Sequence, residues 1–326
     1  MSHEGQQGMD RRRFLAVGAT GLLLLAGCAR WVGDAPSAKR IASPTGGSAG
    51  GATARDRAAA SAPTGPPEPE PDVDDPHDEA PDDDPTGEPD TPEEPEVDPE
   101  LLDASPSEWG ENVSGVRTRL ADSDAIALTL DACGGPGGEG YDAALIDHLR
   151  AGGVPATLFV NARWLAANRA VFDELAADPL FTIENHGTEH RPLSVDGRSA
   201  YGISGTASAQ AAIEEVLGCQ RRIEELTGRA PRLFRSGTAH YDDVAVRIVQ
   251  ELGLEVAGYS VLGDAGATFS AGQVRDQLLG AGPGAIVLLH MNHPASGTAD
   301  GVAQALPMLL ERGRTFTGLD GDQPLT

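Results

Sequence analysis

The sequence of 326 residues is poor in basic side chains: 24 Lys and Arg stand against 50 Asp and Glu, which gives a formal net charge of -26. Proteins that bind nucleic acid need basic patches to face the phosphates, so this balance argues against a nucleic-acid partner. The acidity is uneven, because 18 of the acidic residues lie between Glu68 and Asp103, in a stretch without Lys or Arg. It is therefore a property of that segment rather than of the whole chain.

No hydrophobic run reaches the roughly 20 residues that a membrane-spanning helix needs. The apolar run at residues 16–26 follows three arginines at 11–13 and ends in Leu-Ala-Gly-Cys28. A charged start before a short apolar run is typical of an export signal. The paired arginines resemble the twin-arginine pattern, and Leu-Ala-Gly-Cys resembles a bacterial lipobox. Residues 1–28 are therefore predicted to be a twin-arginine lipoprotein signal, with an uncleaved N-terminal anchor as the alternative. The expected location is the outer face of the cell membrane, held by a lipid on Cys28.

Cysteine is rare as well, with only three in the chain. If Cys28 carries a lipid, Cys133 and Cys219 remain, and two thiols of an exported protein either pair or stay free.

Large apolar side chains are nearly missing from residues 29–106, which are rich first in Ala, Gly and Ser and then in Pro, Asp and Glu. Such a segment cannot bury enough surface to offset chain entropy, so it is predicted to be a disordered linker. Its prolines and carboxylates favour extended conformations that reach on the order of 200 Å at most. A plain spacer and a binding segment are both consistent with this composition.

After residue 122, short apolar runs alternate with amphipathic stretches. This alternation predicts an α/β domain with a parallel sheet, either open or closed into a barrel. Strands are expected at 125–130, 156–160, 181–184, 232–234, 255–261, 285–289 and 315–317, and helices at 141–151, 163–177, 208–227, 242–252, 271–279 and 300–312. Gly228 is expected to end the helix before it.

Polar side chains follow the predicted strands, which is where parallel α/β folds carry their chemistry. They are Asp131, His186, His190, Arg235, Asp264 and His290. The spacing of His186 and His190 lets two imidazoles reach one metal ion in a helix or a tight turn. Taken alone, each feature also has an explanation without a function: an exposed histidine pair, an aspartate that caps a helix, or a buried histidine with its hydrogen bonds satisfied.

In order, these segments resemble the five short motifs of the polysaccharide deacetylases. The matching segments are Leu128-Thr129-Leu130-Asp131, His186 to His190, Leu233-Phe234-Arg235, Asp264 and Leu288-Leu289-His290. The resemblance implies a distorted (β/α) barrel over residues 123–319 that removes acetyl groups from N-acetylated sugars with a divalent metal ion, zinc being favoured. It further implies that His186 and His190 bind the metal, that Asp131 is the base, and that His290 is the acid. Arg235 would keep Asp131 ionised, Asp264 would orient His290, and a backbone N–H near Thr238 would stabilise the oxyanion.

The sequence departs from the family pattern at the third metal ligand. The family has two consecutive aspartates, whereas this chain has Asp131-Ala132. Asp131 itself, water, Cys133 or Asp142 could fill the position, and a thiolate would suit zinc.

Two further motifs differ. The third motif reads Arg235-Ser236-Gly237-Thr238-Ala239-His240-Tyr241 without the usual proline, and Ala265 replaces an expected tryptophan. These changes predict a pocket that is wider or has a different floor. A glycine-rich loop at 134–138 could admit a polymer or cap the site. His293 adds an imidazole near His290, although an exposed loop histidine is the favoured interpretation.

The predicted function is metal-dependent N-deacetylation of a cell-wall or extracellular polysaccharide, peptidoglycan or chitin-like, by a hydrolase acting on carbon–nitrogen bonds other than peptide bonds. One alternative is an exported hydrolase of other amides or of O-acetyl esters that uses the same residues. The other is a degenerate glycan-binding lipoprotein, because the chain lacks the family's second aspartate.

Overall fold

The computed structural model describes residues 96–322 and 324–326. The predicted export signal, Cys28 and the predicted linker up to residue 95 lie outside the described residues. Packing extends beyond both predicted bounds of the domain, 123 and 319. Val97 and Leu101 are buried, and Thr326 exchanges backbone hydrogen bonds with Arg119. No helix in the described part of the chain is both long enough and apolar enough to cross a membrane.

The described residues form one main sheet in which every pairing is parallel. The strand order is β2 (Val116–Arg117), β8 (Glu255–Ala257), β6 (Leu233–Phe234), β5 (Phe181–Asn185), β4 (Ala156–Val160), β3 (Ile126–Ala132), β10 (Ile286–His290) and β9 (Val261–Leu262), and β11 (Phe316–Thr317) pairs with the start of β3. A separate antiparallel pair joins β1 (Trp109–Gly110) to β7 (Tyr241–Asp242).

The sheet must curl, since two strands that are far apart in the strand order are connected by a segment of only three residues. Strand β8 lies near one edge and β9 at the other, yet only residues 258–260 connect them, which span about 10 to 14 Å. The prediction of one strand over 255–261 was therefore wrong: the chain leaves β8 and crosses to the opposite edge. The predicted fold class, a distorted (β/α) barrel, is confirmed.

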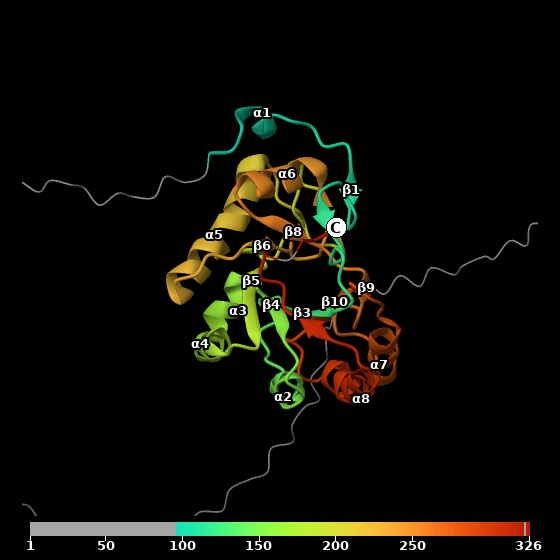
Figure 1. Cartoon of the computed structure of the whole chain (residues 1–326). Helices are drawn as coiled ribbons and strands as arrows, with labels where there is room; N and C mark the ends of the chain where they lie inside the picture. The colour runs from blue at the N-terminus through green and yellow to red at the C-terminus, as the bar shows by residue number, and fades with distance from the viewer. Residues whose placement is uncertain (1–95, 323) are drawn as a thin grey trace, which may run out of the picture. The chain divides into compact units, whose positions relative to one another are not determined.

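Helices lie around the strands on the outside of the curl (Figure 1). They are α1 (Pro99–Leu102), α2 (Ala143–Gly152), α3 (Ala162–Ala167), α4 (Arg169–Ala177), α5 (Ala209–Thr227), α6 (Asp243–Glu251), α7 (Ala271–Gly280) and α8 (Thr298–Glu311). The helix predicted over 163–177 is two helices that meet at Asn168. Gly228 ends α5 in the left-handed region, as predicted, with φ 68°.

Side chains of strand β3 point alternately toward the helices and toward the inside of the curled sheet. Its even-numbered residues, Ile126, Leu128, Leu130 and Ala132, belong to the core beneath the helices. Its odd-numbered residues point inside the curl, where Ala127 packs in a smaller cluster with Phe159. Successive strand residues face opposite sides, so Thr129 and Asp131 follow Ala127 inward. The polar end of β3 thus opens at the carboxyl end of the barrel.

Candidate active site

Asp131 lies at the carboxyl end of β3, directly opposite His290 of β10. Its Oδ1 atom accepts a hydrogen bond of 2.8 Å from Nη1 of Arg235, which is fully buried. Its Oδ2 atom lies 3.6 Å from Nε2 of His186. One oxygen of the carboxylate is therefore held by a guanidinium while the other faces the imidazole.

Arg235 follows β6 and is anchored inside the barrel. Its other guanidinium hydrogens reach the carbonyl oxygens of Ala257 and Gly258 and the hydroxyl of Thr129. The guanidinium also lies 4.1 Å from the centroid of the Phe159 ring. A buried charge with all these partners has a fixed place, so it fixes the orientation of the Asp131 carboxylate as well.

The histidine pair follows β5 in a tight turn rather than a helix. His190 adopts φ 60°, and Gly187 adopts φ 78°. A Cβ atom on Gly187 would lie 2.5 Å from Oε1 of Glu215, so glycine is required there. The turn brings the two imidazole centroids to 5.0 Å.

Groups that the sequence did not single out hold this turn. The buried carboxylate of Glu215 on α5 accepts hydrogen bonds from the backbone N–H of Glu189 and of Arg191. The Asn161 side chain donates to the carbonyls of His186 and Gly187. A lone Glu in an amphipathic helix and an Asn before a helix carry no local signal of this role.

A set of possible metal donors lies at the turn. Nδ1 of His186 donates to the carbonyl of Arg235 at 2.9 Å, which leaves Nε2 free to bind a metal ion. Nε2 of His190 is buried without a hydrogen-bond partner. The Sγ atom of Cys133 lies 3.7 Å from Nε2 of His186, and one ligand atom from each of the three residues falls within 4.8 Å of the others. Of the alternatives for the third ligand, the structure brings Cys133 into this set.

Cys133 directly follows β3, and its side chain continues the alternation of that strand's side chains between core and site, so it faces the site. Ala132 is fully buried among the apolar residues under the helices, so its side chain faces away from the site. Burial raises the pKa of the Cys133 thiol, but the charge of His190 and hydrogen bonds from His186, His190 and His290 outweigh it. The pKa therefore lies well below its usual value, which favours the thiolate.

The other candidates for the third ligand have different surroundings. Asp142 caps α2, where its Oδ1 accepts from the backbone N–H of Leu145, and it lies outside the donor set. Cys133 and Cys219 are both free thiols, and the S–H of Cys219 donates to the carbonyl of Val160. The disulfide alternative does not hold in this structure.

His290 ends β10 and is paired with Asp264. Its Nδ1 donates to Oδ1 of Asp264 at 2.8 Å, and its backbone N–H donates to Oδ2. Thr298 donates to the same carboxylate. Burial lowers the pKa of His290, but the charge and hydrogen bond of Asp264 raise it well above its usual value. The imidazole can therefore hold a proton.

The third motif forms a loop packed on the histidine pair. A Cβ atom on Gly237 would lie 2.3 Å from the backbone of His190. Tyr241 is fully buried, and its hydroxyl accepts from the backbone N–H of Ser236, so its ring is not available to a ligand. Thr238, near the expected oxyanion position, has a buried hydroxyl without a partner. His293 lies 3.3 Å from the Asn292 amide and outside the donor set.

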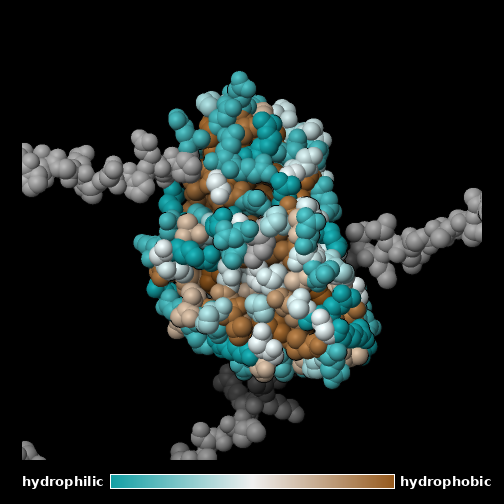
Figure 2. Space-filling model, in the orientation of Figure 1, coloured by the Kyte–Doolittle hydropathy of each residue, from teal (hydrophilic) through white to brown (hydrophobic). Residues whose placement is uncertain are grey.

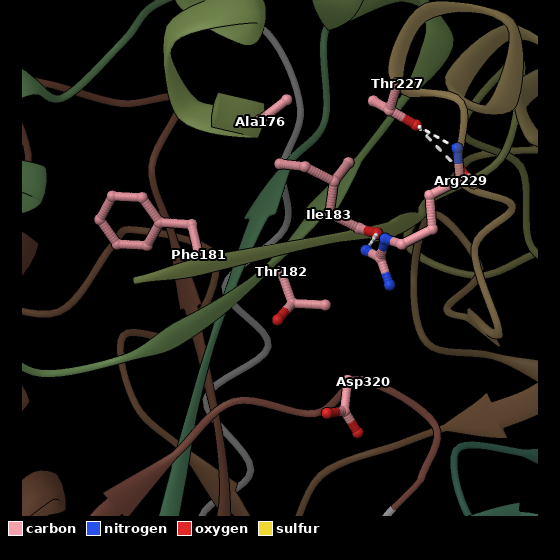
Figure 3. Close-up of a pocket in the computed structure, with 7 residues that line it drawn as sticks. All are labelled: Ala176, Phe181, Thr182, Ile183, Thr227, Arg229 and Asp320. Atoms are coloured by element: carbon pink, nitrogen blue, oxygen red, sulfur yellow. Dashed lines mark hydrogen bonds between the residues drawn. The ribbon is translucent and has the colours of Figure 1, made fainter. Parts of the chain in front are cut away.

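A cavity of about 310 Å³ lies elsewhere (Figure 3). It is lined by Phe181 and Thr182 at the start of β5, with Arg229 and Asp320. The amino end of a parallel strand is opposite the end that carries Asp131 and His290. The cavity is therefore separate from the candidate active site.

Comparison with known families gives one match, to the polysaccharide deacetylases, over residues 119–257. This confirms the resemblance that the motifs predicted. A search of curated proteins gave no match.

Three solved structures with the same fold illustrate the similarity, at 20 to 22% identity to this chain. A peptidoglycan N-acetylglucosamine deacetylase is 20% identical, with a TM-score of 0.53, and the match covers 63% of this chain and 90% of that one. PdaA of Bacillus subtilis, a family 4 carbohydrate esterase, is 21% identical, with a TM-score of 0.53 and coverages of 63% and 83%. A CE4 family pseudoenzyme from Bacillus anthracis is 22% identical, with a TM-score of 0.52 and coverages of 66% and 73%. The fold is thus shared by enzymes and by a pseudoenzyme.

Proposed function

We propose that the polysaccharide deacetylase domain of this chain, a hydrolase of carbon–nitrogen bonds by its family, removes acetyl groups from N-acetylated sugars of a cell-wall or extracellular glycan. The observation that carries the proposal is the position of Asp131. Its carboxylate is fixed by Arg235 on one side and faces His186 of the donor set on the other. A base beside a set of metal donors is what metal-dependent hydrolysis needs.

The donor set fits a divalent metal ion. His186 has its second ring nitrogen engaged, His190 has a buried nitrogen without a partner, and Cys133 supplies a thiolate. These three residues would hold the metal, which supplies Lewis acidity to polarise the acetyl carbonyl and to lower the pKa of water. Nitrogen and thiolate donors together favour zinc, a borderline-soft ion.

The residues of the chain divide the proton transfers between them. Asp131 takes a proton from the water whose oxygen attacks the acetyl carbonyl carbon. Protonated His290 then gives its proton to the sugar nitrogen as the carbon–nitrogen bond breaks, which releases acetate and a free amine. Asp264 favours the charged form of His290 and fixes the orientation of its ring, and Arg235 keeps Asp131 oriented.

Two observations support a glycan of the cell envelope as substrate. Residues 1–28 carry the pattern of a twin-arginine lipoprotein signal, which would hold the domain outside the cytoplasm through Cys28. Residues 29–95 are rich first in Ala, Gly and Ser and then in Pro, Asp and Glu, a composition suited to a spacer between anchor and domain. Peptidoglycan is the first substrate to test, and O-acetylated glycans follow because the same residues can cleave an ester.

A glycan-binding protein without catalysis is the second candidate. Ala132 stands where the family has a carboxylate ligand, and one similar structure is described as a pseudoenzyme. Asp131 and the charged His290 favour catalysis, since binding alone requires neither a base nor an acid.

The test measures zinc content and acetate release from chitooligosaccharides, peptidoglycan and O-acetylated xylan. The native protein should contain about one zinc ion and release acetate, and Asp131→Asn should lose about 10²- to 10⁴-fold in rate while Asp173→Asn, on the surface of α4, should not. Absence of both metal and acetate would leave the glycan-binding candidate. Equal rates for the native protein and Asp131→Asn would remove Asp131 from its assigned role.

A further inference from the structure

Aromatic rings from distant parts of the chain gather beside the active site. The imidazole of His240 lies 5.8 Å, between ring centroids, from Trp109 of β1 and 5.2 Å from Tyr201. Tyr259 joins them through Glu111, whose carboxylate accepts from the hydroxyl of Tyr259 at 2.8 Å and from that of Tyr201 at 3.1 Å. We call these five residues the aromatic platform.

Backbone pairing, a hydrogen bond and a cation–π contact hold the platform in place. Strand β1 pairs with β7, which begins directly after His240, so the backbone fixes Trp109 beside it. Nδ1 of His240 donates to the carbonyl of Thr238 at 2.8 Å. The guanidinium of Arg198 lies 6.0 Å from the centroid of the Trp109 ring, within the range of a cation–π contact. Rings held in this way lose little conformational entropy when a ligand binds.

The platform adjoins the catalytic residues through two short connections. His240 ends the loop whose Gly237 packs against the backbone of His190. Tyr259 directly follows Gly258, whose carbonyl accepts from the guanidinium of Arg235. The platform and Asp131 therefore share the carboxyl end of the barrel.

The exposed surface of the platform suits a sugar. Tyr201 is 59% exposed, while Trp109 and Tyr259 are half-buried. A hexopyranose presents a face of C–H groups that packs on an aromatic ring, and its hydroxyls find partners in groups such as a carboxylate or a phenol. Over the face shown in Figure 2, hydrophilic and hydrophobic residues are interspersed, as on an ordinary surface.

We infer that the aromatic platform is a subsite for a neighbouring sugar of the same glycan chain whose acetyl group reaches Asp131 and His290. The identity of the sugar rests on the proposed function, whereas the binding does not require turnover. Trp109 and Glu111 precede the residues that match the family model, whereas Tyr201 and His240 lie within them. The subsite predicts that oligosaccharides of several β-linked hexopyranoses bind more tightly than a disaccharide.

Calorimetric titration of the full chain with chitobiose and chitohexaose tests the subsite without relying on catalysis. The native protein should bind chitohexaose at least about tenfold more tightly than chitobiose, and Trp109→Ala and Tyr201→Ala should each reduce this preference by about fivefold or more. Trp109→Phe, which keeps a ring, should retain most of it. Met308→Ala, which alters an exposed apolar residue on α8, is the matched control and should behave as native.

Acetate release measured on the same pair of sugars separates the two proposals. Length-dependent binding without acetate would support the platform and contradict the proposed function. Equal affinity of the native protein for both sugars, or an unchanged preference in both alanine variants that remain folded by circular dichroism, would overturn the subsite.

Discussion

The Sγ atom of Cys133 lies 3.7 Å from Nε2 of His186, on the same side of the chain as Asp131. Ala132, between the two, turns into the core. The family that this chain resembles has two consecutive aspartates here, and this chain has a carboxylate and a thiol separated by one residue. In the proposed mechanism Asp131 acts as the base, and Cys133 would supply the third donor.

Replacing Cys133 should therefore weaken metal binding. Cys133→Ser removes the thiolate and leaves two imidazoles, so zinc affinity should fall by about 100-fold or more, since even outer partners of metal ligands are worth 10- to 100-fold. Competition with a chromophoric chelator measures the affinity. Cobalt substitution gives a second readout, because a thiolate–cobalt charge-transfer band should be present in the native protein and missing in Cys133→Ser. Cys219→Ala is the control, as its buried thiol lies away from the donor set. Unchanged affinity in Cys133→Ser would remove Cys133 from the site.

Restoring the aspartate of the family should not restore the site. Ala132→Asp would place a carboxylate in the apolar core, which should cost about 3 kcal/mol or more of unfolding free energy, as an unpaired buried charge does. Cys133→Asp should keep a folded domain that binds metal, with a weaker preference for zinc over harder ions. Urea unfolding and elemental analysis of both variants distinguish the positions. A stable Ala132→Asp protein that binds zinc as tightly as native would contradict the orientation of this residue.

The pairing of His290 with Asp264 predicts a pH dependence. The pKa of His290 is raised, so the ion pair stabilises the fold fully below the usual pKa of histidine, and this contribution is lost as pH rises through the higher folded-state value. A general acid must hold its proton, so activity should also decline on that high-pH side. Asp264→Asn should move the high-pH limb of kcat/KM to lower pH by about 1 to 2 pH units. Asp276→Asn, exposed on α7, should leave the profile in place, and an unmoved limb in Asp264→Asn would separate His290 from the acid role.

Glu184, on β5, gives a test of stability that does not involve the active site. Burial raises its pKa from 4.5 to about 7, although the backbone N–H groups of Leu233 and Arg232 oppose this. The folded state keeps the proton to higher pH than the unfolded state, so the folded protein should lose about 3 kcal/mol as pH rises from 4.5 to 7. Glu184→Gln should remove most of this loss, as seen by urea unfolding across that range. Glu174→Gln, on the surface of α4, should retain it.

The sequence predicted the long elements well because their signals are local. Strands β3 and β10 are mostly apolar and are buried on both faces, and α5 has an amphipathic pattern that ends at Gly228. The placement of Asp131 and His290 at strand ends follows from these elements, since register in a parallel sheet then brings them together.

The short elements escaped prediction because tertiary contacts define them. Strands β2 and β9 have two residues each and exist only through pairing with β8 and β10. The aromatic platform was missed for the same reason: Trp109 and Tyr201 are isolated rings in polar segments, and only the fold brings them together. The choice of Cys133 over Asp142 likewise needed the direction of side chains at the end of β3.

The pleat at the end of β3 has a consequence for how such a site can diverge. Its two faces alternate, so in this chain Asp131 and Cys133 share the face of the site while Ala132 between them faces the core. A lineage can therefore exchange an oxygen ligand for sulfur without relocating His186 or His190, provided that the strand remains extended through Ala132 and the next residue carries the new atom. The metal that such a protein takes from its surroundings would be decided by one side chain, while the rest of the barrel stays the same.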